Sequence, residues 1–184
     1  MRKFFGLLTF AAALTLAMTV AARAAKFVLS SPSIIEGGIV PNAHIYNGYG
    51  YHGANRSPQL SWTGAPPGTK SFAVTVYDPD APHAGGWRHW LVFDIPAGAD
   101  GLPEDAGNGT GLPAGAVQSM TDFRTTGYGG PCPPPGKPHR YIFTVYALSV
   151  GRLELSAKDV PAKVDEEIRR HAIGQASITA KFGR

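Results

Sequence analysis

Three apolar runs constrain the fold of this chain more than any other feature. Residues 72–77, 89–95 and 141–148 are rich in β-branched, aromatic and aliphatic side chains. The first run ends at Asp78-Pro79 and the second ends at Pro96. Such runs are typical of strands that are buried on at least one face. The sequence therefore predicts a β-sheet that contains all three.

The rest of the chain favours further short strands. Its 23 Gly and 16 Pro are the residues that make turns between strands. Residues 60–62 form a shorter candidate strand, and apolar residues alternate with more polar ones over 176–182, which predicts a final strand. The Gly- and Pro-rich segment 96–117 has no period, and we expect a long surface loop there.

Only one segment is helical in pattern. Pro161 can begin a helix, Val164, Ile168 and Ala172 recur every four residues, and Gly174 can end it. Acidic residues lie early in this segment and basic residues later, as the helix dipole favours. The predicted fold class is all-β with a minor helix: an antiparallel β-sandwich with one C-terminal helix and a final short strand.

The N-terminus predicts export. A basic start, the apolar run 4–20 and the small-residue pattern Ala22-Arg23-Ala24 are typical of a signal peptide cleaved after Ala24. We expect residues 1–24 to be the signal, residues 25–184 to be one domain, and the product to be periplasmic or secreted. An uncleaved membrane anchor is the alternative. No later stretch is long and apolar enough to span a bilayer.

Charge and cysteine content narrow the possible functions. Removal of Arg2, Lys3 and Arg23 with the signal lowers the formal net charge from +4 to +1. The mature chain therefore lacks the basic excess that nucleic-acid binding requires. The single cysteine, Cys132, cannot form an internal disulfide. We expect a buried thiol, with a role at a site as the alternative.

Three polar clusters lie beside the apolar runs. They are Asp78-Pro79-Asp80-Ala81-Pro82, Trp87-Arg88-His89-Trp90, and the Gly- and Pro-rich segment 127–141 that ends in His-Arg-Tyr. Strand ends meet at the edge of a sheet, so loops that are distant in sequence can line one hollow. The sequence thus predicts a polar pocket.

These motifs, in this order, resemble the phosphatidylethanolamine-binding (Raf-kinase-inhibitor) protein family. The resemblance extends from about Ser57-Pro58 to the C-terminus, and Cys132 in Gly-Pro-Cys-Pro-Pro with the final Phe182-Gly183-Arg184 is similar to the family's bacterial branch. It implies a Greek-key β-sandwich whose pocket accepts phosphate-like anions or phospholipid head groups. Animal members carry a further C-terminal helix that is missing here, so the kinase-inhibitor role does not carry over.

The resemblance also implies which residues form the ligand site. The matching positions are Asp78, Asp80, Trp87, His89, Gly130, Pro131, Pro133, His139 and Tyr141.

In physical terms, a carboxylate beside an imidazole favours the positive form of the ring, which can hold a phosphate oxygen together with a Tyr hydroxyl. Glycine-rich turns can point backbone N–H groups at the same anion. Ethanolamine phosphate, with both charges, suits such a site. For single residues, structural roles stay open: turns at the prolines and aspartates, a core position for His89 and an ion pair for Arg140.

Two other functions stay open. An enzyme acting on phosphoesters could use His89 with Asp78, although neither Gly-x-Ser-x-Gly nor His-Glu-x-x-His occurs. A protein-interaction module, similar to protease or kinase inhibitors, could use segment 96–117. A metal site built from Asp78, Asp80, His83 and His89 is a weaker possibility. We assign no catalytic residue, metal or cofactor.

Overall fold

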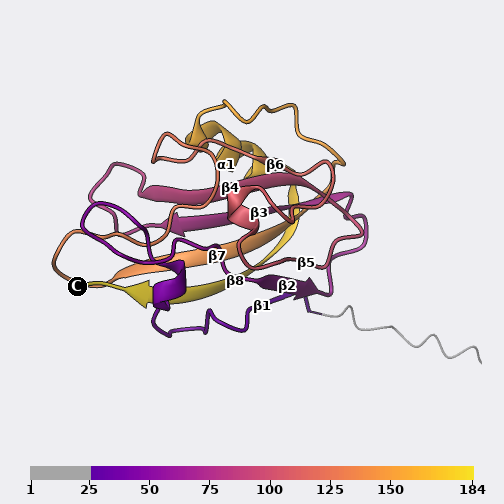
Figure 1. Cartoon of the computed structure of the whole chain (residues 1–184). Coiled ribbons are helices and arrows are strands. Elements are labelled where there is room, and N and C mark those ends of the chain that lie inside the picture. Colours follow the sequence, from indigo (N-terminus) through magenta and orange to yellow (C-terminus); the bar gives the residue numbers. More distant parts are fainter. Residues whose placement is uncertain (1–25) are drawn as a thin grey trace, which may run out of the picture.

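Residues 26–184 fold into two antiparallel sheets and one α-helix (Figure 1). The computed structural model describes residues 26–184, so the predicted signal peptide and its cleavage site lie outside the described residues. Over the described range, no helix has the length and apolar character needed to cross a membrane. The two-sheet architecture with one helix and a C-terminal strand confirms the predicted fold class.

The larger sheet has the strand order β6-β4-β3-β7-β8, and the smaller has the order β1-β2-β5. Strand β7 returns by a long connection to lie beside β3 instead of β4, a path typical of a Greek key. The strands are β1 (Val28–Ser30), β2 (Leu60–Thr63), β3 (Ser71–Asp78), β4 (Trp87–Pro96), β5 (Gly101–Leu102), β6 (Val117–Gln118), β7 (His139–Leu148) and β8 (Ala172–Phe182).

Both faces of the larger sheet are buried, which explains the near-continuous apolar runs in the sequence. Along β7, Tyr141, Phe143 and Val145 belong to the core between the two sheets. Tyr146 and Leu148 belong to a second core on the opposite face. The alternation follows from the two-residue period of a strand.

A bulge in β4 keeps its apolar residues on the correct faces. Phe72 pairs with Ile95 but Val74 pairs with Val92, so β4 has one residue more than β3 between these pairs. Asp94 lies in the bulge with φ of +55°, and its carboxylate accepts a hydrogen bond from the backbone N–H of Leu153. The extra residue places Val92 and Ile95 in the same core.

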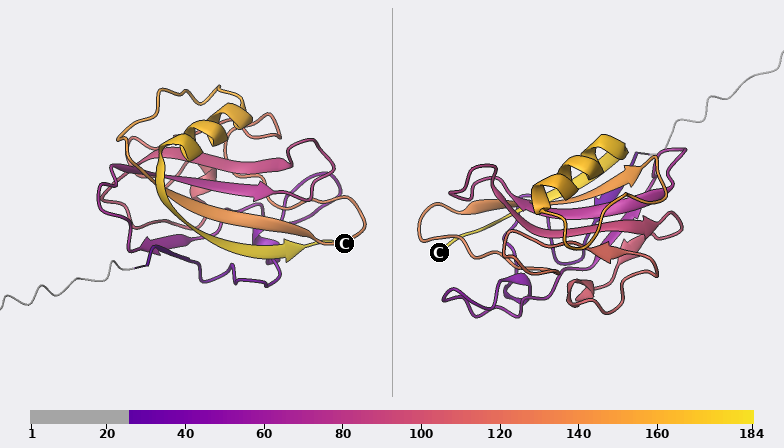
Figure 2. Two further views of the ribbon diagram at one scale, coloured as in Figure 1. Left: turned by 180° about the vertical axis from the view of Figure 1, so that it is seen from behind. Right: turned by 90° about the horizontal axis from the view of Figure 1, so that it is seen from above.

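Helix α1 (Pro161–His171) covers the outer face of the larger sheet (Figure 2), with Val164 and Ile168 fully buried. The helix begins at Pro161 as predicted, but it ends at His171, before Gly174. Gly174 lies inside β8, where an added Cβ would come within 2.6 Å of Pro66. Its role is thus a close approach, not a helix end. The final strand has 11 residues, so the prediction of a short one is wrong.

Segment 96–117 is more structured than predicted. It contributes β5 to the smaller sheet and a 3-10 turn, η2 (Ala106–Asn108). Leu102 and Ala106 are fully buried in the core between the sheets. Two isolated apolar anchors produce no period, which is why the pattern did not indicate them.

We predict that Ile168→Ala destabilises the fold by about 3 kcal/mol, because it leaves a cavity between α1 and the sheet. Urea denaturation measures this free energy of unfolding. The matched substitution Ile35→Ala, at a side chain 61% exposed, should change it by less than about 0.5 kcal/mol. Equal effects of the two substitutions would contradict the packing described for the helix.

Candidate functional site

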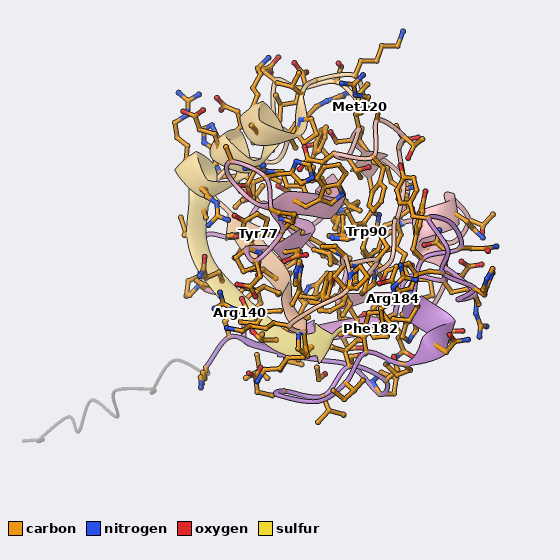
Figure 3. The ribbon with its side chains drawn as sticks, turned by 90° about the vertical axis from the view of Figure 1, so that its left-hand side faces the viewer. Tyr77, Trp90, Met120, Arg140, Phe182 and Arg184 are labelled. Carbon is orange, nitrogen blue, oxygen red and sulfur yellow. The ribbon has the colours of Figure 1, made fainter. Side chains whose placement is uncertain are left out.

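The polar clusters converge because the strands that carry them are antiparallel. Asp78 at the end of β3 pairs with Trp87 at the start of β4. His139 at the start of β7 pairs with Phe182 at the end of β8. These four strand ends therefore lie at one edge of the larger sheet, the end of the molecule that faces the viewer in Figure 3.

A cavity of about 330 Å³ opens at this edge. Its buried lining consists of Tyr51, Asp78, His89, Pro133, His139 and Tyr141. Its partly buried lining consists of Ala81, Trp87, Phe123 and Cys132. Its exposed rim consists of Tyr49, Pro82, His83, Pro134 and Arg184. The volume is of the order that encloses a small ligand.

Most of the residues predicted to bind ligand line this cavity, namely Asp78, Trp87, His89, Pro133, His139 and Tyr141. Asp80, Gly130 and Pro131 do not line it.

Sequence reasoning missed several other lining residues. Tyr49, Tyr51 and Phe123 come from irregular segments that carry no periodic signal, and the sequence offers His83 only the weaker possibility of a metal ligand. Arg184 was noted only within the terminal Phe-Gly-Arg sequence that marks the family's bacterial branch.

Asp78 orients His139. Its Oδ2 accepts a hydrogen bond of 2.8 Å from Nδ1 of His139, and its Oδ1 accepts one of 2.8 Å from the backbone N–H of Asp80. Asp78 is only 2% exposed, so both carboxylate oxygens are committed to protein donors. The carboxylate therefore does not face a ligand as a bare negative charge. Nε2 of His139 makes no hydrogen bond to any residue of 26–184.

His89 differs from His139 in its partner. Its Nδ1 donates a hydrogen bond of 2.7 Å to the backbone carbonyl of Gly129. Burial lowers the pKa of His89 below its ordinary value, although the carbonyl and the nearby Asp78 oppose this shift. The ring is thus neutral at neutral pH, with Nε2 as a hydrogen-bond acceptor. This shift is opposite in direction to the one expected for an imidazole beside a carboxylate, because the loss of hydration outweighs the nearby Asp78.

The hydroxyl group of Tyr141 is the clearest indication that the cavity binds a ligand. Its side chain is fully buried, and its hydroxyl has no hydrogen-bond partner within the described part of the chain. Burial raises its pKa, so the phenol keeps its proton. A buried polar group without a partner is costly, and such groups are rare in native proteins. A ligand that accepts this hydrogen bond would remove the cost.

Asp80 forms an ion pair with Arg140 and does not line the cavity. Its carboxylate accepts hydrogen bonds from the backbone N–H, Nε and Nη2 of Arg140. The guanidinium lowers the pKa of Asp80 to about 2. This separation also leaves the metal set considered above unassembled: across residues 26–184, no three His, Cys, Asp or Glu side chains are grouped to hold a metal ion.

Gly129 and Gly130 have a structural role instead of the predicted anion-binding one. The N–H of Gly129 donates to the carbonyl of His89, and the N–H of Gly130 donates to Oδ1 of Asn55. These two N–H groups are therefore committed to the protein and do not form the expected anion nest. Gly130 also lies against the backbone of the 44–46 segment, where an added Cβ would be 2.2 Å from the carbonyl oxygen of His44.

Aromatic rings and the thiol complete the wall. Phe123 contacts the edges of Trp87 and His89, with ring centroids 5.4 and 5.3 Å apart. Cys132 is partly buried, and desolvation raises the pKa of its thiol to about 12. The expected burial and the alternative of a place at the site thus both apply in part. The thiol is protonated and inert at neutral pH.

We predict that Gly130→Ala destabilises the fold by about 3 kcal/mol or more, because the new methyl group meets backbone atoms that cannot move aside. Urea denaturation checks this value. Gly98→Ala is the control, since nothing lies within 4 Å of that Cβ position, and it should cost less than about 0.5 kcal/mol. A stable Gly130→Ala variant would show that the loop does not pack on this segment as described.

The fold and the cavity together define a class: a one-helix β-sandwich protein with a small polar and aromatic pocket at one end of its larger sheet. The family model for the phosphatidylethanolamine-binding protein matches residues 30–183. The chain belongs to this family. Its match is consistent with the order of the three motifs around the pocket.

Individual relatives agree with this assignment. The chain is 46% identical to the UPF0098 protein YbhB of Escherichia coli over 155 residues, 84% of this chain and 98% of that protein. It is 47% identical to YbcL of the same organism over 168 residues, 90% and 92% of the two chains.

Solved structures agree as well. The crystal structure of E. coli YbcL, described as a new member of the mammalian PEBP family, is similar with a TM-score of 0.85 and 46% identity, covering 87% of this chain and 99% of that one. A putative PEBP homolog from Chlamydia trachomatis, CT736, has a TM-score of 0.71 and 28% identity, covering 86% and 97%. The chain is thus a family protein of the UPF0098 type.

Proposed function

We propose that this chain is an exported binding protein whose pocket takes small phosphate-like anions or phospholipid head groups. The buried hydroxyl of Tyr141 carries the proposal, because it has no hydrogen-bond partner among residues 26–184 and belongs to a side chain that lines the cavity. The family to which the chain belongs is named for a phospholipid with an ethanolamine phosphate head group, which supports the same ligand class.

The charges around the cavity suit an anion. Arg184 lies at the rim with its guanidinium 4.5 Å from the centre of the Tyr51 ring, and it forms no salt bridge within the described residues. Asp78 is shielded by its two hydrogen-bond donors, so it opposes an anion less than a free carboxylate would. A positive charge at the rim draws an anion toward the mouth of the cavity.

The aromatic wall suits the ammonium end of an ethanolamine phosphate. Tyr49, Trp87 and Phe123 present ring faces or edges to the cavity. An ammonium group beside an aromatic face gains roughly 0.5–2 kcal/mol. In our proposal the phosphate lies inside, against Tyr141, and the ammonium lies at the mouth.

We predict that Tyr141→Phe weakens the binding of phosphoethanolamine by about 10-fold or more, because a hydrogen bond to a charged oxygen contributes roughly 1.5–3 kcal/mol. Calorimetric titration measures the affinity. Tyr146→Phe is the matched control, since this tyrosine lies on the opposite face of β7 and should leave binding unchanged.

Two results would contradict this prediction. One is equal affinity of Tyr141→Phe and the unchanged protein, and the other is no heat change at millimolar ligand. The titrated samples, assayed for released phosphate, also distinguish binding from hydrolysis of the ester.

We also propose that the signal peptide is cleaved after Ala24 and that the mature protein is periplasmic or secreted. The protein produced in E. coli from the full sequence should appear in the osmotic-shock fraction or the medium. Its intact mass should be that of a chain whose first residue is Ala25. A variant without residues 2–24 should stay in the cytoplasm. Recovery of the full-length mass in the membrane fraction would instead support an uncleaved anchor.

A further inference from the structure

The pocket contains a hydrogen-bond donor and a hydrogen-bond acceptor on neighbouring side chains. This arrangement favours phosphate compounds that can both accept and donate a hydrogen bond. The donor is the Tyr141 hydroxyl, which has no partner in residues 26–184. The acceptor is Nε2 of His89, because Nδ1 of that ring already donates to the carbonyl of Gly129. The two rings pack edge to face with centroids 5.2 Å apart. Both side chains line the same cavity, so our inference places one small group against both of them.

A fully ionised phosphate can form a hydrogen bond with the donor but not with the acceptor. Its oxygens can accept from Tyr141, but a second oxygen would meet the lone pair of His89 Nε2. A phosphate that keeps one P–OH satisfies both, since the P–OH donates to Nε2 while another oxygen accepts from the phenol. Phosphate monoesters can carry this proton near neutral pH, because their second pKa is about 6. Inorganic phosphate has a higher second pKa and carries it more readily. A phosphodiester has no such proton to offer.

Resting on the proposed function, we infer that the site is selective for phosphate monoesters, and for inorganic phosphate, over phosphodiesters. In the complex, one proton is shared between Nε2 of His89 and a phosphate oxygen. The anion thus binds together with a proton whenever the free ligand is doubly ionised. A free monoester or the head group of a hydrolysed lipid fits this site, whereas the diester of an intact phospholipid fits it poorly.

Other titratable groups face His89 and must be considered as sources or acceptors of the proton. Asp78 on β3 has both oxygens engaged, and Asp122 accepts from the backbone N–H of Arg88. Burial raises the pKa of both Tyr141 and Cys132, so each keeps its proton over the working range.

His139 is different, because its Nε2 has no hydrogen-bond partner among the described residues. His83, at the rim, is a further imidazole that lines the same cavity. Arg184 at the rim adds a positive charge.

Calorimetric titration of the whole mature protein tests the inference. The probes are phosphoethanolamine, a monoester, and glycerophosphoethanolamine, a diester with the same ammonium group. At pH 8 the monoester should bind at least about 10-fold more tightly, since the diester has no proton to donate to Nε2 of His89. Titrations in buffers of different ionisation enthalpy should show uptake of about one proton per complex at pH 8, and close to none at pH 5.

The variant His89→Gln tests whether His89 shares the proton that is taken up on binding. The amide can donate to the phosphate directly, so this variant should lose most of the preference for the monoester and most of the proton uptake. Tyr141→Phe, in contrast, should weaken both probes by a similar factor. Retained proton uptake in a folded His89→Gln protein would assign the proton to another group of the pocket and overturn the inference.

The outcomes separate the inference from the function on which it rests. Equal affinity for the two probes, or no proton uptake by the unchanged protein at pH 8, overturns the inference and leaves anion binding intact. No binding of either probe contradicts the proposed function, and the inference with it. If His89→Gln does not fold, the inference is still tested by the unchanged protein, through its ratio of monoester to diester affinity and its proton uptake.

Discussion

The antiparallel pairing of β3 with both β4 and β7 determines where the polar groups of the buried cavity lining lie. It places the end of β3 beside the starts of its two neighbours, so Asp78, His89 and Tyr141 reach one cavity from three separate parts of the chain. The register is strongly held, because both faces of the sheet are buried and a shift of one residue would exchange the two cores. The pocket is therefore formed by the rigid edge of a sheet, with loops completing its walls.

Two histidines at this edge acquire different properties from their partners. His139 donates to a carboxylate and His89 donates to a backbone carbonyl, so the two rings are oriented in different ways by the same sheet edge. Burial keeps His89 neutral. The result is a pocket with a fixed donor at Tyr141, a fixed acceptor at His89 and a cationic rim at Arg184. Such groups are held in place before a ligand arrives, which lowers the entropic cost of binding.

Much of this arrangement could be predicted from the sequence. The apolar runs indicated the central strands because both faces of the sheet are buried, and strand-end clusters indicated a shared edge. The order of the motifs indicated the family. Other features depend on contacts that sequence does not encode locally. Asp78 and Asp80 are the same residue type two positions apart, yet one faces the cavity and the other pairs with Arg140. Gly130 has a packing role set by a distant segment, and Phe123 comes from a stretch without any period.

A high-resolution crystal structure of the mature protein with phosphoethanolamine tests the central claim most directly, namely that the unpartnered phenol is the anchor of an anion site. The account predicts a phosphate inside the cavity, with one oxygen about 2.5–3.0 Å from Oη of Tyr141 and another within about 3.2 Å of Nε2 of His89. A phosphate bound elsewhere on the molecule, with only water at the phenol under saturating ligand, would contradict it.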